Sequence, residues 1–222
     1  MDIVKPQTHN EKDVVKYFKY SGKPWGVLFL LLISVIGIIL IPIIWKIYSK
    51  PKLSDYDIDK LWDEVAKSRE DEAYRVANYD KEDALRDAQY FLAYPSTLSP
   101  NSEFREKEGD DGYFRRNHMK LVYMIYGRDQ LIVFDENICL DDLWDGSDRT
   151  EEYYWSDVSS VTFDERQDMM QIAVGPKIIN YPLTGEELHG DEEALERSAY
   201  FKQAQEVANA VRMILREKKS SS

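Results

Sequence analysis

The sequence predicts an α+β protein: a single N-terminal transmembrane helix, a helical segment, and then an antiparallel β-meander closed by a C-terminal helix. Three observations support this order. Residues 25–45 carry no charge, residues 58–92 place apolar side chains at helical spacing, and residues 119–183 form short β-rich runs between turns. The expected segments are a basic segment at 1–23, a transmembrane helix at 24–45, a basic collar and helical stalk at 46–94, a linker at 95–112, and a β domain with its C-terminal helix at 113–219.

The apolar run is long enough to cross a bilayer. Val, Leu, Ile and Phe fill fifteen of the twenty-one positions from Trp25 to Trp45. A helix of that length is about 31 Å long, close to the roughly 30 Å of the hydrocarbon core. Trp25 and Trp45 are expected at the headgroup layer, as are Lys46, Lys50 and Lys52 just after the run. No small-residue cleavage site follows, so we expect the run to be retained.

The orientation of the run is not fixed by charge, because lysines flank both of its ends. The chain has one cysteine, Cys139, and no Asn-x-Ser/Thr sequon. These features favour a single-pass protein whose domain at 53–222 is cytoplasmic, with Cys139 reduced. Gly37 and Pro42 leave a second possibility open, in which the run bends and returns with both ends on one side.

The net charge of −12 is distributed unevenly along the chain. Residues 1–52 carry a net charge of +5 and the remaining residues carry −17. The basic part can lie at anionic headgroups, whereas the acidic part is repelled by them and by nucleic acid. We therefore expect a membrane and another protein as partners, and neither nucleic acid nor a small-molecule substrate. A role of the acidity in solubility alone stays open.

Helices are expected between the apolar run and the linker. Ser54 can cap a helix, since apolar residues recur at helical spacing through residues 58–66. A second apolar stripe runs from Asp80 to Leu92 and stops at Pro95. These segments predict a helical stalk or lid. The stretch rich in Pro, Gly and Ser that follows is the predicted linker.

Beyond the linker the pattern changes to that of strands. Residues 119–126 and 130–135 flank Gly127-Arg128-Asp129 and predict a hairpin, and residues 169–174 and 178–183 predict another around Gly175-Pro176. Two further strands are expected at 153–155 and 158–163. A C-terminal helix is predicted from Asp191, and its apolar face, about six turns long, needs to be covered by a curved sheet of about six or seven strands.

One segment of the meander points to a family. The run Trp155-Ser156-Asp157-Val158-Ser159-Ser160-Val161, followed by a later hairpin and one closing helix, resembles a step that is common in bacterial pleckstrin-homology-like (PH-like) domains. The resemblance covers roughly residues 113–218 and implies a PH-like β domain on a membrane-anchored protein. Related domains bind phosphoinositide headgroups through basic residues near the first hairpin. The positions that this implies here are Arg115, Arg116, Lys120 and Arg128.

No catalytic site, metal site or cofactor is predicted. His9, His118 and His189 lie in separate segments without the spacing of metal ligands, and Cys139 has no partner motif. His118 is expected to be a hydrogen-bonded surface residue. Ser156-Asp157 is expected to form a turn.

An acidic loop partly matches a calcium-binding loop. Asp141, Asp145, Gly146 and Glu152 fit four of its positions, but Leu143 stands where an oxygen ligand is required. The sequence therefore predicts a solvated hairpin loop here.

Together these interpretations favour a membrane-tethered, non-enzymatic interaction module, an adaptor or scaffold that presents an acidic PH-like domain. Two alternatives remain open: a lipid headgroup sensor, and an enzyme whose site is assembled from residues far apart in the sequence. A basic pocket would favour the sensor. A deep cleft with convergent carboxylates or histidines would favour the enzyme.

Overall fold

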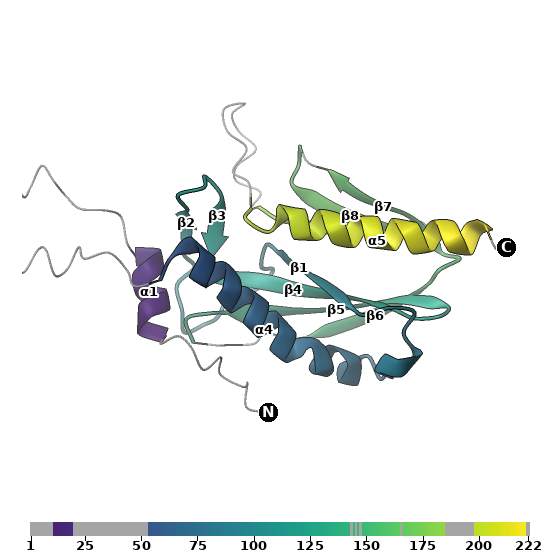
Figure 1. Cartoon of the computed structure of the whole chain (residues 1–222), viewed down its shortest axis with the longest axis horizontal. Helices are drawn as coiled ribbons and strands as arrows, with labels where there is room; N and C mark the ends of the chain where they lie inside the picture. The colour runs from purple at the N-terminus through teal and green to yellow at the C-terminus, as the bar shows by residue number, and fades with distance from the viewer. Residues whose placement is uncertain are drawn as a thin grey trace, which may run out of the picture.

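The chain folds as an α+β protein with antiparallel sheets and a C-terminal helix, as the sequence predicts (Figure 1). The computed structural model describes residues 11–19, 53–142, 144, 146, 148–164, 166–184 and 198–220. The predicted transmembrane helix at 24–45 lies outside these residues, as do Trp25, Trp45, Lys46, Lys50 and Lys52. Among the described helices, none combines the length and the apolar character that a membrane crossing needs.

The described elements follow one another from the N-terminal helix to the C-terminal one (Figure 1). The helices are α1 (Glu11–Lys19), α4 (Asp55–Val76), the 3₁₀ turn η1 (Lys81–Asp83) and α5 (Phe201–Ser220). The strands are β1 (Gln89–Ala93), β2 (Glu106–Glu108), β3 (Phe114–Arg116), β4 (His118–Tyr126), β5 (Gln130–Cys139), β6 (Arg149–Tyr154), β7 (Val158–Asp164), β8 (Met169–Val174) and β9 (Lys177–Pro182).

The described strands form three antiparallel sheets. A four-stranded sheet has the order β1-β4-β5-β6, a three-stranded sheet has the order β7-β8-β9, and β2 pairs with β3 in the connection between β1 and β4. The predicted hairpins are confirmed: β4 and β5 pair from His118 opposite Cys139 to Tyr126 opposite Leu131, and β8 pairs with β9 up to Val174 opposite Lys177.

The four-stranded sheet is covered on both faces, and each face has its own core. One face packs against α4 and α1, and its largest buried side chain is Trp62 of α4. The other face packs against α5 and the three-stranded sheet, around residues such as Tyr126, Met170 and Val211. The apolar face of α5 is therefore covered, as its periodicity requires.

The helical interpretation of residues 80–94 was wrong, because β1 occupies Gln89–Ala93 and pairs with β4. Phe91 lies in the core beneath α5, and its neighbour Leu92 lies in the core beneath α4. Both side chains are buried because the sheet is covered on both faces, so the strand shows no alternation. The sheet is thus not confined to residues 113–219, and α4 packs on it rather than extending as a stalk.

Two further boundaries differ from the prediction. The expected linker at 95–112 contains β2, which pairs with β3. The C-terminal helix begins at Phe201, after Ser198 bridges to Phe114 in parallel; the expected start at Asp191 lies outside the described residues. Ser54 caps α4 as predicted: its hydroxyl accepts from the backbone N–H of Asp57, whose carboxylate accepts from the N–H of Ser54 in return.

Candidate functional site

The candidate site is a groove between β7 and α5. Strand β7 is an edge strand of the three-stranded sheet in the described part of the chain, and α5 runs beside it (Figure 1). Arg212 Nε donates to the carbonyl of Val161 at 2.6 Å, and Lys219 Nζ donates to that of Ser159 at 3.1 Å. Because a strand residue directs its N–H and C=O to the same side, the N–H of Val161 also faces this edge.

The groove is open and basic. Its volume is about 560 Å³, and Val161 and Leu215 supply its apolar part. The described residues that line it include three cations, Arg212, Arg216 and Lys219, and no carboxylate. Arg216 and Lys219 are exposed. In a chain of net charge −12 this is a local reversal of sign, which solubility does not explain.

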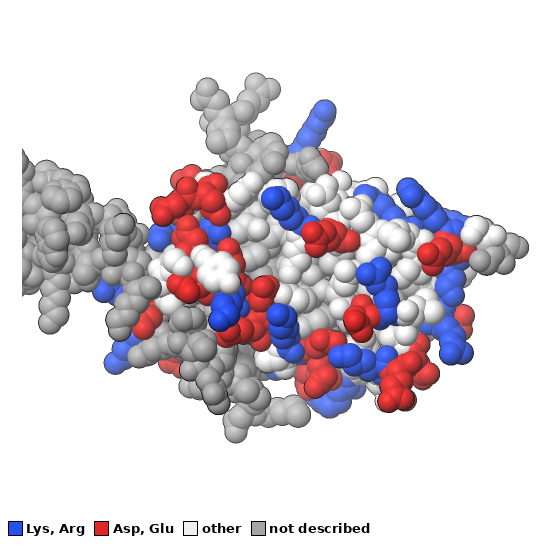
Figure 2. Space-filling model, in the orientation of Figure 1, with Lys and Arg blue, Asp and Glu red and all other residues white. Residues whose placement is uncertain are grey.

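Acidic and basic side chains are intermixed over the surface, with a local excess of each kind at one place. Figure 2 shows basic side chains over the end of α5, at the right of the view, and acidic ones crowded at the β2–β3 hairpin. The final lysines, Lys218 and Lys219, also complement the negative end of the helix dipole. Arg216 and Arg212 lie about one and two turns before the end of α5, respectively, where the dipole has little influence. Their placement therefore needs another explanation.

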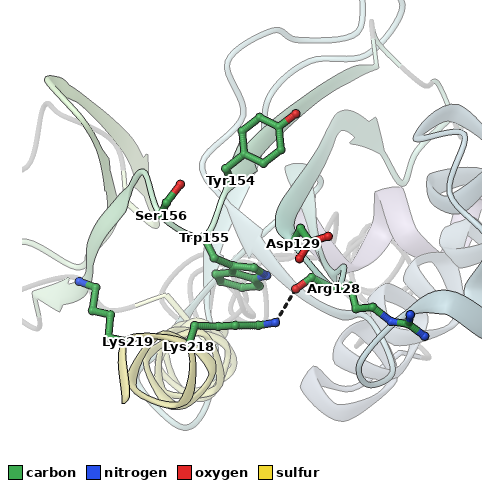
Figure 3. A pocket seen from close by; sticks show the side chains of 7 residues that line it. All are labelled: Arg128, Asp129, Tyr154, Trp155, Ser156, Lys218 and Lys219. Atoms are coloured by element: carbon green, nitrogen blue, oxygen red, sulfur yellow. Dashed lines mark hydrogen bonds between the residues drawn. The ribbon is translucent and has the colours of Figure 1, made fainter. Parts of the chain in front are cut away.

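A second hollow of about 340 Å³ adjoins the groove and shares Lys219 with it (Figure 3). Trp155 is buried at its base, with Nε1 donating to the carbonyl of Gly127 at 2.9 Å. Lys218 Nζ donates to the carbonyl of Arg128 at 2.5 Å. In Figure 3 the guanidinium of Arg128 points away from this hollow, and Lys218 and Lys219 point in different directions. Their charges do not converge on one anion.

The predicted headgroup residues do not form one exposed cluster. Arg115 is 3% exposed, and its guanidinium forms two bonds of 2.8 Å to Asp59 of α4 and further bonds of 2.8 and 2.9 Å to Asp111. Burial opposes the charged form, but the hydrogen bonds that Arg115 donates to Asp111 and Asp59 raise the pKa of Arg115 above its usual value. This arginine therefore joins α4 to the β2–β3 hairpin.

Two more of the predicted headgroup residues, Arg116 and Lys120, are also held internally. Arg116 is 0% exposed, pairs with Glu106, and donates from Nη1 to the carbonyl of Leu183 at 2.9 Å. Lys120 lines a hollow of about 330 Å³ between β1, β4 and β9, and its ammonium lies 3.7 Å from the buried carboxylate of Asp135.

Arg128 is separated from the other three headgroup candidates by the length of a strand. It follows β4, whereas Lys120 lies near the start of β4. The six steps of strand from Lys120 to Tyr126 span roughly 20 Å, too far for one headgroup to reach both.

Two residues that the sequence predicts to be at the surface or solvated are buried. His118 is 0% exposed, and its Nδ1 lies 3.0 Å from Oδ1 of Asn117. Burial lowers the pKa of His118. Asp141 accepts hydrogen bonds from Ser102 and Asn117 and pairs with Arg105, so this end of the acidic loop is buried against residues 102–105, whereas Asp148 is exposed, as expected of a solvated loop. No metal-binding cluster of His, Cys, Asp or Glu occurs among the described residues.

Cys139 is a free, buried thiol. Burial raises its pKa to about 12. The thiol is therefore held in its unreactive, protonated form at neutral pH. Ser156 and Asp157 lie in a turn, as predicted.

Sequence reasoning missed the groove, although one signal was present. The chain positions that meet there are 51 and 60 residues apart, so no local motif joins them. The available signal was the basic sequence at the end of α5, Arg212 to Lys219, in an otherwise acidic domain.

Comparison with known proteins gave no relatives: no family model, no curated protein and no solved structure matches this chain.

Proposed function

We propose that this protein is a membrane-tethered, non-enzymatic interaction module whose groove between β7 and α5 binds an acidic segment of a partner protein in extended conformation. The observation that carries the proposal is the meeting of a strand edge with three cations and no carboxylate in one open groove. Binding by strand addition would use the edge for affinity and the cations for selectivity.

Two side chains of α5 already donate hydrogen bonds to the free edge of β7. Arg212 and Lys219 donate hydrogen bonds to the outward carbonyls of Val161 and Ser159 in β7. An incoming strand would displace these side chains from the carbonyls and give their charges a carboxylate instead. Long cationic side chains can make this exchange because they are flexible at the surface.

The PH-like identity of the domain is part of the same proposal. A sheet of four strands followed by a sheet of three, with one helix closing the space between them, supports it. The membrane attachment rests on the apolar run at 25–45 and on the basic residues around it. The headgroup alternative has less support, since Arg115, Arg116 and Lys120 are paired inside the domain.

The test is selection of peptides from a displayed random library on the full chain in detergent micelles. We expect the recovered peptides to combine Asp or Glu with β-branched residues and to bind less tightly as ionic strength rises. Arg216→Glu should weaken the best peptide at least 10-fold. Lys67→Glu, an equal change of charge at an exposed position of α4, should leave binding unchanged.

A second measurement separates strand addition from simple charge attraction. The best peptide is resynthesised with N-methyl groups at alternate backbone nitrogens facing the edge, which removes ladder hydrogen bonds but keeps every charge. We expect binding to be lost. Equal affinity for the methylated peptide, or equal loss in the Arg216 and Lys67 variants, would refute the proposed site.

A further inference from the structure

Helix α1, which precedes the apolar run in the chain, is docked on the domain that follows the run. Val14, Tyr17 and Phe18 of α1 are 2%, 0% and 7% exposed and belong to the core beneath α4. They stand at positions i, i+3 and i+4, so they form one face of the helix. A helix of nine residues is marginal in isolation, so this docking accounts for its formation.

Polar contacts fix the position of α1. The hydroxyl of Tyr17 donates to Asp55 Oδ1 at 2.7 Å, and Asp55 lies in the first turn of α4. The other oxygen of Asp55 accepts from the backbone N–H of Asp110 at 2.7 Å. Lys107 of β2 lies over the Tyr17 ring, with its ammonium 3.9 Å from the ring centroid. Helix α1 therefore contacts both α4 and the β2–β3 hairpin.

The segments on either side of the apolar run therefore belong to one core. Leu53, the first described residue after the apolar run, is 6% exposed and belongs to the same core as Phe18. The 33 residues from 20 to 52 connect the two sides of this one core.

We infer that α1 and the domain at 53–220 lie on the same face of the membrane, and that the apolar run enters and leaves the bilayer from that face. The inference rests on the membrane attachment in the proposed function. One crossing would separate α1 from α4 by the bilayer and exclude the bond from Tyr17 to Asp55. Two complete crossings need about 40 residues, more than the 33 available.

This inference favours the alternative to the single-pass prediction, in which the run bends and returns. Gly37 near the centre of the run and Pro42 near its end are suited to such a bend. The groove between β7 and α5 is unaffected by this choice, since it lies on other elements. A partner would have to be on the same side as both ends of the protein.

Cysteine labelling of the full chain in bacterial membranes tests the inference. Glu11→Cys in α1 and Ser220→Cys in α5 place single reactive thiols at exposed positions. The parent chain is its own control, because Cys139 is buried with a raised pKa and should not react. A membrane-impermeant maleimide is applied to spheroplasts and to inverted vesicles, after fractionation has shown that each variant is in the membrane.

We expect both thiols to be labelled in the same preparation and neither in the other. Labelling of Glu11→Cys in one preparation and of Ser220→Cys in the opposite one would overturn the inference and restore the single pass. Recovery of the chain outside the membrane fraction would instead overturn the membrane attachment, so the two failures are told apart before any labelling.

Amide hydrogen exchange of the full chain in lipid nanodiscs tests the docking itself. We expect residues 11–19 to exchange at least 10-fold more slowly than an unfolded peptide of that sequence. Val14→Asp should remove this protection, whereas Val15→Asp, the same change at a half-buried neighbour, should retain most of it. Unprotected amides in the parent α1 would overturn the inference.

Discussion

Replacement of Val211 tests how α5 closes the β domain. Val211 is 0% exposed and lies in the core between α5 and the two larger sheets. Val211→Ala removes about two methylene equivalents at about 0.8 kcal/mol each, and the cavity brings the expected loss of unfolding free energy to about 2 kcal/mol. Val211→Asp also buries an unpartnered carboxylate, so we expect a loss of about 4 kcal/mol or more at pH 7.

Two matched variants separate burial from charge. Met213→Asp makes the same change two residues along α5, where the side chain is 57% exposed, and should alter the free energy of unfolding by no more than about 0.5 kcal/mol. Val211→Asn keeps the size and polarity of aspartate but does not titrate.

The pH dependence gives a second signature of the buried carboxylate. Burial raises the pKa of an aspartate at position 211 in the folded state above its unfolded value of about 3.9. The folded state then binds more protons than the unfolded state, so stability falls as pH rises through this interval. We expect the difference between the Val211→Asp and Val211→Asn variants to be smaller at pH 5 than at pH 7.

The assay is urea unfolding of the detergent-solubilised full chain, followed by near-UV circular dichroism at both pH values. A free energy of unfolding for Val211→Asp equal to that of Met213→Asp would refute the covered face of α5. That result would show that the apolar face of α5 is exposed instead.

Three further predictions concern single interactions. Trp155→Phe should cost about 1 to 3 kcal/mol in urea unfolding, because the buried carbonyl of Gly127 loses its donor. Ser54→Ala should cost about 1 kcal/mol in the same assay, because the capping box of α4 is lost. The hydrogen bond from Arg115 lowers the pKa of Asp111 to about 2, so its stabilisation should be present above pH 4 and lost as pH falls toward 2. With the carboxylate 44% exposed, this contribution is on the order of 1 kcal/mol, and Asp111→Asn should abolish that part of the acid dependence.

The hairpins, the cap of α4 and the apolar face of α5 could be predicted because each depends on residues close in sequence. Gly175 adopts a positive φ of 53° in the turn between β8 and β9, a conformation that glycine adopts at little cost. The apolar face of α5 follows from a 3.6-residue period in residues 204–215. Such signals need no knowledge of what lies on the other side of the element.

Strand β1 could not be predicted, because its environment is not local. Its apolar run, Tyr90 to Ala93, fits both a helix and a strand buried on two faces, and only the second helical layer makes the sheet two-faced. Tertiary packing also buries charged groups that the sequence predicts to be at the surface. Arg116 was a basic surface candidate in sequence and is a fully buried partner of Glu106 in the fold.

The sequence by itself determined the β4–β5 and β8–β9 hairpins, the apolar face of α5, the apolar run at 25–45, and the difference in charge between the two parts of the chain, because each depends on local period or composition. The tertiary structure decided which charges are available and which segments meet. It paired Arg115 with Asp59 across 56 residues, brought Arg212 to the edge of β7, and placed Tyr17 against Asp55 from the far side of the apolar run. These contacts depend on the closing of long loops, which no local spacing encodes.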